Sequence, residues 1–239
     1  MTLQMQLGSA PRREPRSARD TFSEVILEAA AMATPTGHLG ALWRDVLDRR
    51  AIHCGEGTAP GCRYVLCRLA ESASAIGGAL NGFETDILVR VLGGEQQKAI
   101  AADLRIACST ASKWYTQALA TLELDDAPIP LPLIIAAQSW ASGTMPPVDA
   151  RQATFVYDGS EFVVLTVPAP NLATETRLTP AEREVARALI EGRSRWEIAA
   201  RRSTSTQTVA CQFRGIFSKL QVGGRCSLIK RGLAAGWFQ

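Results

Sequence analysis

Hydrophobic positions recur with helical spacing near the end of the chain, in the stretch STSTQTVACQFRGIFSKLQV (203–222). The apolar side chains that would share one helix face are Val209, Phe213, Ile216 and Leu220. Because a helix repeats about every 3.6 residues, this spacing predicts a helix that packs along one side only. The opposite direction holds side chains that carry little charge, namely Gln207, Cys211, Arg214 and Ser218.

Three other short helices are predicted around this one. Thr179 and Pro180, with Glu182 following closely, have the form of a helix N-terminus with a capping box. Ser194 fits the start of a second helix, and a further helix is expected from about Arg225. Two short helices joined by a tight turn, the second with one buried stripe, make a helix-turn-helix. The spacing alone fits an ordinary four-helix packing unit equally well.

Runs of β-branched and aromatic residues predict two β-hairpins. The clearer one is FVYDGSEFVVLTV (155–167), in which Asp158 and Gly159 occupy the turn. Both residue types tolerate the positive φ that a two-residue turn needs. The other hairpin is expected around GCRYVLCR (61–68).

The chain repeats itself at an offset of 98 residues. Without gaps, residues 80–124 match residues 178–222 with eight identities in forty-five positions, and residues 61–68 fall on residues 159–166. Such a register over this length predicts the same unit twice, a β-hairpin followed by helices. The expected fold class is mainly α with small β-hairpins, in two tandem units of a β-hairpin plus a four-helix group.

The expected domain organisation follows from this repeat. It comprises a disordered basic tail (1–20), an N-terminal unit (21–145) and a C-terminal unit (146–239). The N-terminal unit would hold leading helices, a hairpin at about 52–68 and a degenerate helix-turn-helix at 80–142. The C-terminal unit would hold a hairpin at 152–167 and a helix-turn-helix at 177–237.

Residues from about 177 to 235 resemble the C-terminal DNA-binding domain of LuxR-type transcription regulators. The matches to that family's pattern are Leu178, Thr179, Pro180, Glu182, Arg183, Glu184, Val185, Gly192, Ser194, Glu197, Ile198, Ala199, Thr208, Val209, Ile216, Lys219, Leu220, Val222 and Arg225. The resemblance implies a four-helix domain that reads double-stranded DNA with its third helix. It also implies dimerisation through the fourth helix, by Leu228, Ile229 and Leu233.

The N-terminal unit looks like a degenerate relative of this domain. It keeps Leu80, Glu84 and Gly94, but Asn81-Gly82 replaces the threonine-proline start. Residues 80–126 contain four Lys/Arg and seven Asp/Glu, a net charge of −3, whereas residues 178–239 contain eleven Lys/Arg and four Glu, a net charge of +7. Phosphate neutralisation supplies most non-specific affinity for DNA, so the charge favours the C-terminal unit as the DNA reader.

The candidate DNA-contacting residues lie on and around residues 205–220. They are Arg201, Arg202, Ser205, Thr206, Gln207, Thr208, Ala210, Cys211, Arg214, Lys219 and Arg225. Gln207 is suited to an adenine edge and Arg214 to a guanine or a phosphate. Ala210 stands where the family usually places a lysine, which leaves the base preference open. Possible contacts in the first unit are Arg105, Ser109, Ser112 and Lys113.

The sequence lacks the patterns of membrane proteins, zinc sites and common enzymes. No apolar run reaches the roughly 20 residues that span a bilayer, and no signal peptide pattern opens the chain, so we expect a cytoplasmic protein without membrane contact. Cys54, Cys62 and Cys67 with His53 do not have convincing zinc spacing, so no metal is expected. With no nucleotide-binding or nucleophile motif either, neither an enzyme nor a cofactor is predicted.

Two functions fit these observations. The first is a bacterial-type transcription regulator that reads DNA through the C-terminal helix-turn-helix, as a homodimer or as an intramolecular pseudo-dimer of its two units. The second is an interaction protein that binds another regulator or RNA polymerase and has no specific DNA site of its own. The acidic first unit and Ala210 favour the second function somewhat.

Overall fold

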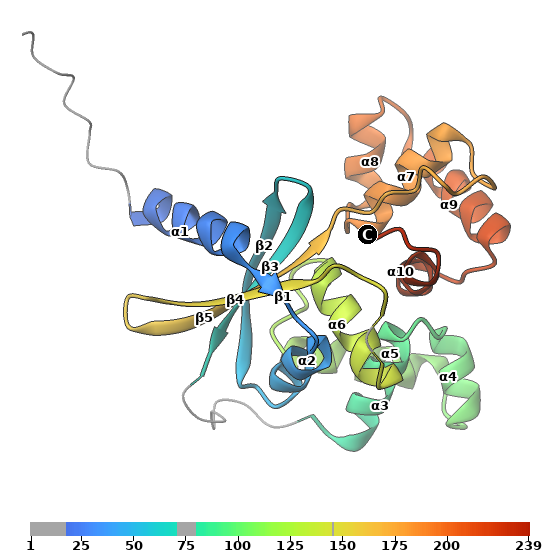
Figure 1. Cartoon of the computed structure of the whole chain (residues 1–239). Coiled ribbons are helices and arrows are strands. Elements are labelled where there is room, and N and C mark those ends of the chain that lie inside the picture. Colours follow the sequence, from blue (N-terminus) through green and yellow to red (C-terminus); the bar gives the residue numbers. More distant parts are fainter. Residues whose placement is uncertain (1–17, 71–79, 145) are drawn as a thin grey trace, which may run out of the picture.

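The two hairpins and β1 join into one five-stranded antiparallel sheet, with α1 on one side and the other helices on the opposite side (Figure 1). The structure is a computed structural model that describes residues 18–70, 80–144 and 146–239. The strand order is β1-β4-β5-β3-β2. The strands are β1 (Thr34–Pro35), β2 (Ala51–Ala59), β3 (Cys62–Leu69), β4 (Arg151–Tyr157) and β5 (Ser160–Pro168).

The pairing of β3 with β5 corrects the expected fold class. These strands are antiparallel from Cys62 opposite Pro168 to Arg68 opposite Phe162. Both are apolar on successive residues, so both of their faces require cover, and a two-stranded hairpin alone is marginally stable. The hairpins are therefore parts of one sheet rather than of separate tandem units, and the fold is mixed α/β rather than mainly α.

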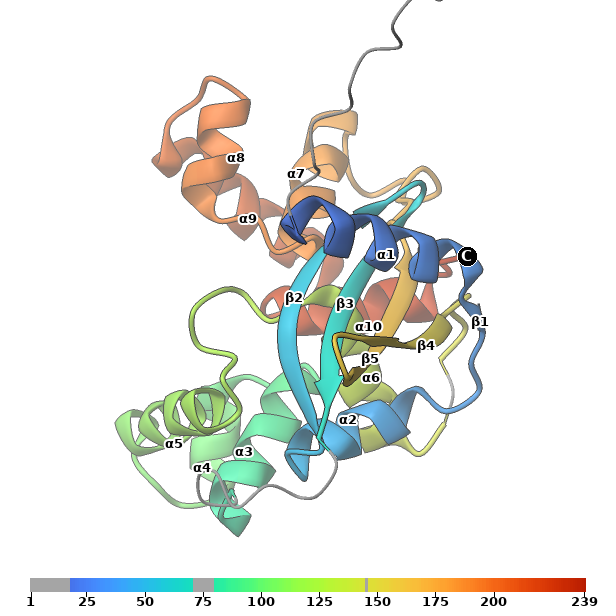
Figure 2. The ribbon, with the colours of Figure 1, turned by 90° about the vertical axis from the view of Figure 1, so that its left-hand side faces the viewer.

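Helices cover both faces of the sheet (Figure 2). On one face, α1 packs over Leu66 and Phe162, and the ring of Phe22 lies 4.6 Å from that of Tyr157 and 5.4 Å from that of Phe162. The other face packs on α2 and α6. The helices before the second hairpin are α1 (Ala18–Met32), α2 (Leu39–Leu47), α3 (Gly82–Leu92), α4 (Gln97–Asp103), α5 (Cys108–Thr121) and α6 (Leu131–Ser142). Of the predicted tail, residues 18–20 belong to α1 and residues 1–17 lie outside the described residues.

The last four helices are α7 (Pro180–Ile190), α8 (Arg195–Arg201), α9 (Thr206–Leu220) and α10 (Arg225–Ala234). Helices α7, α8 and α9 each begin 98 residues after α3, α4 and α5. Positive φ angles recur at the same offset, in the pairs Gly94 and Gly192, Arg105 and Ser203, and Glu123 and Gln221. The two three-helix groups thus share helix starts and turn conformations, at opposite ends of the molecule (Figure 1).

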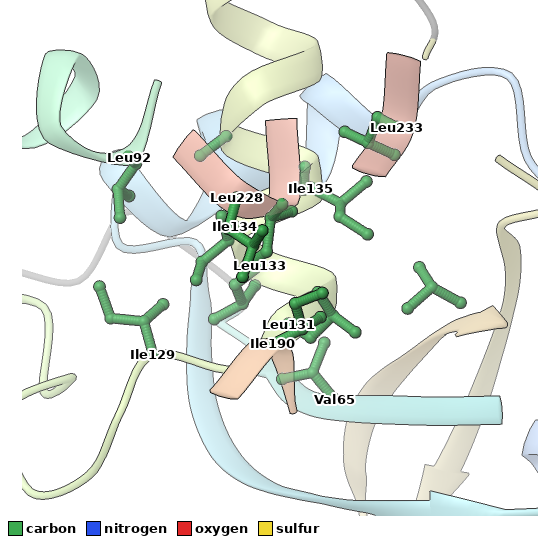
Figure 3. Close-up of a cluster of buried hydrophobic side chains, with 14 of the residues drawn as sticks. Val65, Leu92, Ile129, Leu131, Leu133, Ile134, Ile135, Ile190, Leu228 and Leu233 are labelled. Atoms are coloured by element: carbon green, nitrogen blue, oxygen red, sulfur yellow. The ribbon is translucent and has the colours of Figure 1, made fainter. Parts of the chain in front are cut away.

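Helix α6 runs through the centre of the main hydrophobic core (Figure 3). Every residue from Leu131 to Ser139 is buried, because α2, α3, α10 and the sheet surround the helix. Its one long polar side chain, Gln138, bridges two neighbours. The amide of Gln138 donates to the carbonyl of Leu92 at 2.8 Å and to that of Cys226 at 3.0 Å, which ties α3 to α10.

Helix α10 is covered from within the chain, which corrects the predicted dimer contact. Leu228 and Ile229 are 0% exposed and Leu233 is 5% exposed. They belong to the same core as α6, and Trp237 and Phe238 close over Gly232 on the same helix. These leucine and isoleucine side chains therefore offer no surface to a second copy in this fold.

We predict that Gln138→Leu lowers the free energy of unfolding by about 1–3 kcal/mol, because two carbonyls in the core lose their donor. Urea unfolding followed by circular dichroism measures this change. The matched control is Gln117→Leu on the exposed side of α5, which should shift stability by less than about 0.5 kcal/mol. Unchanged or higher stability of Gln138→Leu would contradict the bridging role.

Candidate nucleic-acid interface

Helix α9 presents one polar face to solvent because the opposite face is fixed in the core. Val209, Ile216 and Leu220 are at most 1% exposed. Phe213 and Phe217 pack at the edge of the same core, with ring centroids 6.1 Å apart. Helices α7 and α8 supply the contacts that hold α9 in this orientation.

Three capping residues fix where the helices of this group begin. Thr179 and Ser194 each form a capping box, with Glu182 and Glu197 respectively. The backbone N–H of Ser194 donates to the Glu197 carboxylate and holds the pKa of that carboxyl below its usual value. Ser205 caps α9 by accepting a hydrogen bond from the backbone N–H of Thr208 at 3.0 Å. The predicted base-contacting helix thus begins at Thr206.

The turn between α8 and α9 is tight. Ser203 adopts a φ of 51°, and the backbone N–H of Thr204 bonds the carbonyl of Ala199 at 3.0 Å. This turn brings the exposed first turn of α9 close to the C-terminus of α8. Arg201, Ser205, Thr206, Gln207 and Thr208 are all exposed there.

The middle of α9 exposes a small polar strip. Gln207, Cys211, Arg214 and Ser218 are exposed at helical spacing, whereas Ala210 is half-buried. The Arg214 guanidinium donates to the Cys211 sulfur at 3.1 Å. Among the described residues, neither Arg201 nor Arg214 forms an ion pair, so both cations are free to meet an anion.

The other predicted cations at the ends of α9 are paired with α7. Lys219 Nζ lies 2.7 Å from both carboxylate oxygens of Glu182. This contact, together with the backbone N–H of Thr179, lowers the pKa of the Glu182 carboxyl below its usual value. Arg202 pairs with Glu184 in the same way. Both cations are thereby fixed in place before any ligand arrives.

Arg225 faces inward, which corrects its predicted place on the phosphate edge. Its guanidinium donates to the carbonyl of Leu189 at 3.0 Å, to that of Ile190 at 2.9 Å and to that of Ile129 at 2.6 Å. Burial lowers the pKa of Arg225. The residue caps the C-terminal end of α7 and ties it to the segment before α6. All three of its nitrogens are therefore already bonded to carbonyls of the chain.

The candidates in the first group of helices lie on a less positive surface. Arg105, Ser109, Ser112 and Lys113 are all exposed on or just before α5. Nearby, Arg90 is held by two carboxylates, at 2.8 Å from Glu95 and 2.7 Å from Asp103. The structure thus brings these candidates to one surface, but carboxylates neutralise the cation beside them.

One exposed aromatic residue was missed by the sequence reasoning. Trp196, in the first turn of α8, is 70% exposed and stands beside the exposed Arg195. Its helical position opposite the inward-facing Ile198 and Ala199 is the signal that could have identified it. The residue adds a large apolar surface close to the candidate interface.

Three other features can be assessed in the part of the chain that the structure describes: a metal site, a reactive thiol and a membrane-spanning helix. Within residues 18–70, 80–144 and 146–239, no group of three or more His, Cys, Asp or Glu side chains is placed to hold a metal ion. Burial raises the pKa of the Cys67 thiol to about 12, which makes it an unreactive core residue. No described helix is both long and apolar enough to cross a membrane.

The contact between Lys219 and Glu182 can be tested through the pKa of the Glu182 carboxyl. We expect Lys219→Ala to raise the pKa of Glu182 toward its usual value, measured by the pH titration of its carboxyl carbon in NMR spectra. Because the carboxyl has a lower pKa in the folded chain than in the unfolded one, its contribution to stability is present at neutral pH and is lost as the pH falls through the lowered pKa. Lys230→Ala, on the exposed side of α10, is the control that should leave the titration unchanged; an equal effect of both variants would refute the pairing.

The comparisons with known proteins agree with this geometry in one part of the chain. The model of the family "Bacterial regulatory proteins, luxR family" matches residues 176–231, which contain α7 to α9 and most of α10. A search of the curated proteins finds no significant match. Residues 176–231 are therefore a LuxR-family helix-turn-helix domain.

Proposed function

We propose that the protein is a sequence-specific transcription regulator that reads double-stranded DNA mainly through α9. The observation that carries this proposal is the exposed strip of Gln207, Cys211 and Arg214 on the third helix of a LuxR-family domain. In a helix-turn-helix, the N-terminal part of the second helix of the motif enters the major groove. The first turn of α9 is exposed and lies next to Arg201, so it is free to enter a groove.

The side chains suit distinct tasks at a DNA surface. Gln207 can bond the two edge atoms of adenine, and Arg214 those of guanine. Arg201, which lacks a carboxylate partner, is suited to a phosphate. The half-buried Ala210 supplies a small apolar contact, of the kind that meets a thymine methyl group. Lys219 and Arg202 would also contact DNA phosphates, each by releasing its carboxylate partner, Glu182 or Glu184.

We also propose that α3, α4 and α5 are a degenerate helix-turn-helix and that the chain is an intramolecular pseudo-dimer. The shared helix starts and the paired positive φ angles at an offset of 98 residues support a common origin of the two groups. Helix α10 follows the second group and packs on α6, which follows the first. This contact inside one chain takes the place of a contact between two subunits.

A partner-binding role for the first group has its own support. Phe83 is 56% exposed and stacks on Trp114 with ring centroids 5.0 Å apart. An exposed phenylalanine on a half-buried tryptophan, within an acidic group of helices, suits protein contact better than DNA contact. The first group would then assist the DNA reader by binding another regulator or RNA polymerase.

DNA reading is tested with duplexes selected from a random pool and measured by fluorescence anisotropy at two salt concentrations. Arg214→Ala should weaken binding roughly 5- to 150-fold, mainly through one base position, because a bidentate base contact is worth about 1–3 kcal/mol. Arg201→Ala should weaken binding to all sequences and reduce the salt dependence by about one phosphate contact. Lys230→Ala serves as the charge-matched control. If no duplex is selected even at low salt, the chain does not read DNA.

The pseudo-dimer predicts the mass of a single chain in solution. Because α10 buries its apolar side against α6, sedimentation equilibrium should show a monomer at micromolar concentrations. The complex with a selected duplex should contain one chain per site. A stable dimer of the free protein, or two chains on one minimal site, would contradict the intramolecular arrangement.

A further inference from the structure

A cavity of about 360 Å³ lies between the β2–β3 hairpin and the first two helices of the LuxR-family domain. The hairpin contributes Thr58 and Arg63, whose turn lies at the end of the sheet nearest to α7 (Figures 1 and 2). Helix α7, helix α8 and the turn between them contribute the remaining walls. The volume lies within the range of about 300–1,000 Å³ that is usual for small-molecule sites.

Arginine dominates the lining of this cavity. Five guanidinium groups line it, those of Arg63, Arg187, Arg193, Arg201 and Arg202. The carboxylates in the lining are those of Glu184 and Glu191, so the walls carry an excess of positive charge. Glu184 is already engaged by Arg202, and Glu191 lies 3.6 Å from Arg193. Arg187 and Arg201 form no ion pair within the described residues.

Two of these cations lie largely out of solvent with few acceptors. The side chain of Arg63 is only 13% exposed; its guanidinium donates to the carbonyl of Glu191 at 3.5 Å, and the carboxylate of Glu56 lies 3.8 Å away, beyond hydrogen-bond distance. The Nε atoms of Arg193 and Arg202 are buried and have no partner within hydrogen-bond distance in the described part of the chain, although Glu191 lies 3.6 Å from the first and Glu184 pairs with another nitrogen of Arg202. Placing charged donors in such a recess is costly unless an anion meets them.

We propose that this cavity binds a small molecule that carries a phosphate or diphosphate group, such as a nucleoside diphosphate. Guanidinium groups bind phosphate oxygens in a bidentate manner, and the hairpin, α7, α8 and the turn between the two helices all supply them. Thr58 adds a hydroxyl donor, and the two carboxylates can accept hydrogen bonds from ligand hydroxyl groups. The hairpin and the DNA-reading domain would thus hold the ligand between them.

The site also suggests how the ligand would act on DNA binding, and this step rests on the proposed function. Arg201 and Arg202 line the cavity and also flank the first turn of α9. A phosphate bound in the cavity would occupy guanidinium groups that DNA phosphates otherwise use. The ligand is therefore expected to weaken DNA binding.

Isothermal titration calorimetry without DNA tests the site itself, with pyrophosphate and ADP as probes at constant ionic strength. We expect saturable binding with one site per chain, weakened at least tenfold by Arg63→Gln and by Arg193→Gln. Arg195→Gln removes the same charge from an exposed position outside the cavity and should change the affinity less than twofold. Thermal unfolding of each variant confirms that it is folded. Absent binding, or equal loss in all three variants, would overturn the proposal.

A second measurement separates this site from an extended DNA surface. Anisotropy of a selected duplex should show weaker DNA binding when ADP is added, and this effect should disappear in Arg63→Gln. If Arg63→Gln weakens duplex binding as strongly as Arg201→Ala and neither probe binds, the cavity belongs to the DNA path and the small-molecule site is refuted. If the probes bind but no duplex is selected, the cavity is upheld and the proposed DNA function alone fails.

Discussion

The need to cover α6 on every side organises the whole molecule. A helix that is apolar around its full circumference gains stability only when other elements remove all of its faces from water. In this chain α2, α3, α10 and the sheet do so, with Leu133, Ile135 and Leu228 meeting in one core (Figure 3). The amide nitrogen of Gln138 is satisfied there by the two carbonyls to which it donates, whereas Oε1 of the same side chain is buried without a hydrogen-bond partner among the described residues.

This arrangement places the two groups of three helices on opposite sides of one central core. Helix α10 packs on α7 within the LuxR-family domain and also on α6 in the central core. The domain is therefore not an independent module on a linker. Arg225 strengthens the connection, because its guanidinium joins the end of α7 to the segment that precedes α6. Helix α6 is therefore joined to the LuxR-family domain by packed side chains of α10.

The sequence predicted what local spacing determines and failed where distant segments meet. The helical periodicity of Val209, Ile216 and Leu220 identified the buried face of α9, and the family comparison confirms a LuxR-family domain there. The pairing of β3 with β5 could not be predicted from either hairpin alone. Apolar strands indicate that their faces and edges must be buried, but not which distant segment buries them. For the same reason, charge alone could not show that Arg225 points inward, and apolar character could not show that Leu228 packs within its own chain.

The middle of α9 carries little charge, and two of the cations that flank it are already paired. The cations that flank the helix at Arg202 and Lys219 are held by carboxylates of α7, so their positions are set by the fold rather than by a ligand. If a DNA phosphate replaced Glu182 as the partner of Lys219, the new phosphate contact would come at the loss of the Lys219–Glu182 ion pair. The net gain in affinity for DNA would then be small. Binding to any DNA would then depend chiefly on Arg201 and Arg214, the cations without such partners. In the proposed DNA complex, discrimination between sequences would then rest on Gln207 and Arg214, and Ala210 would shape the contact without adding charge to it.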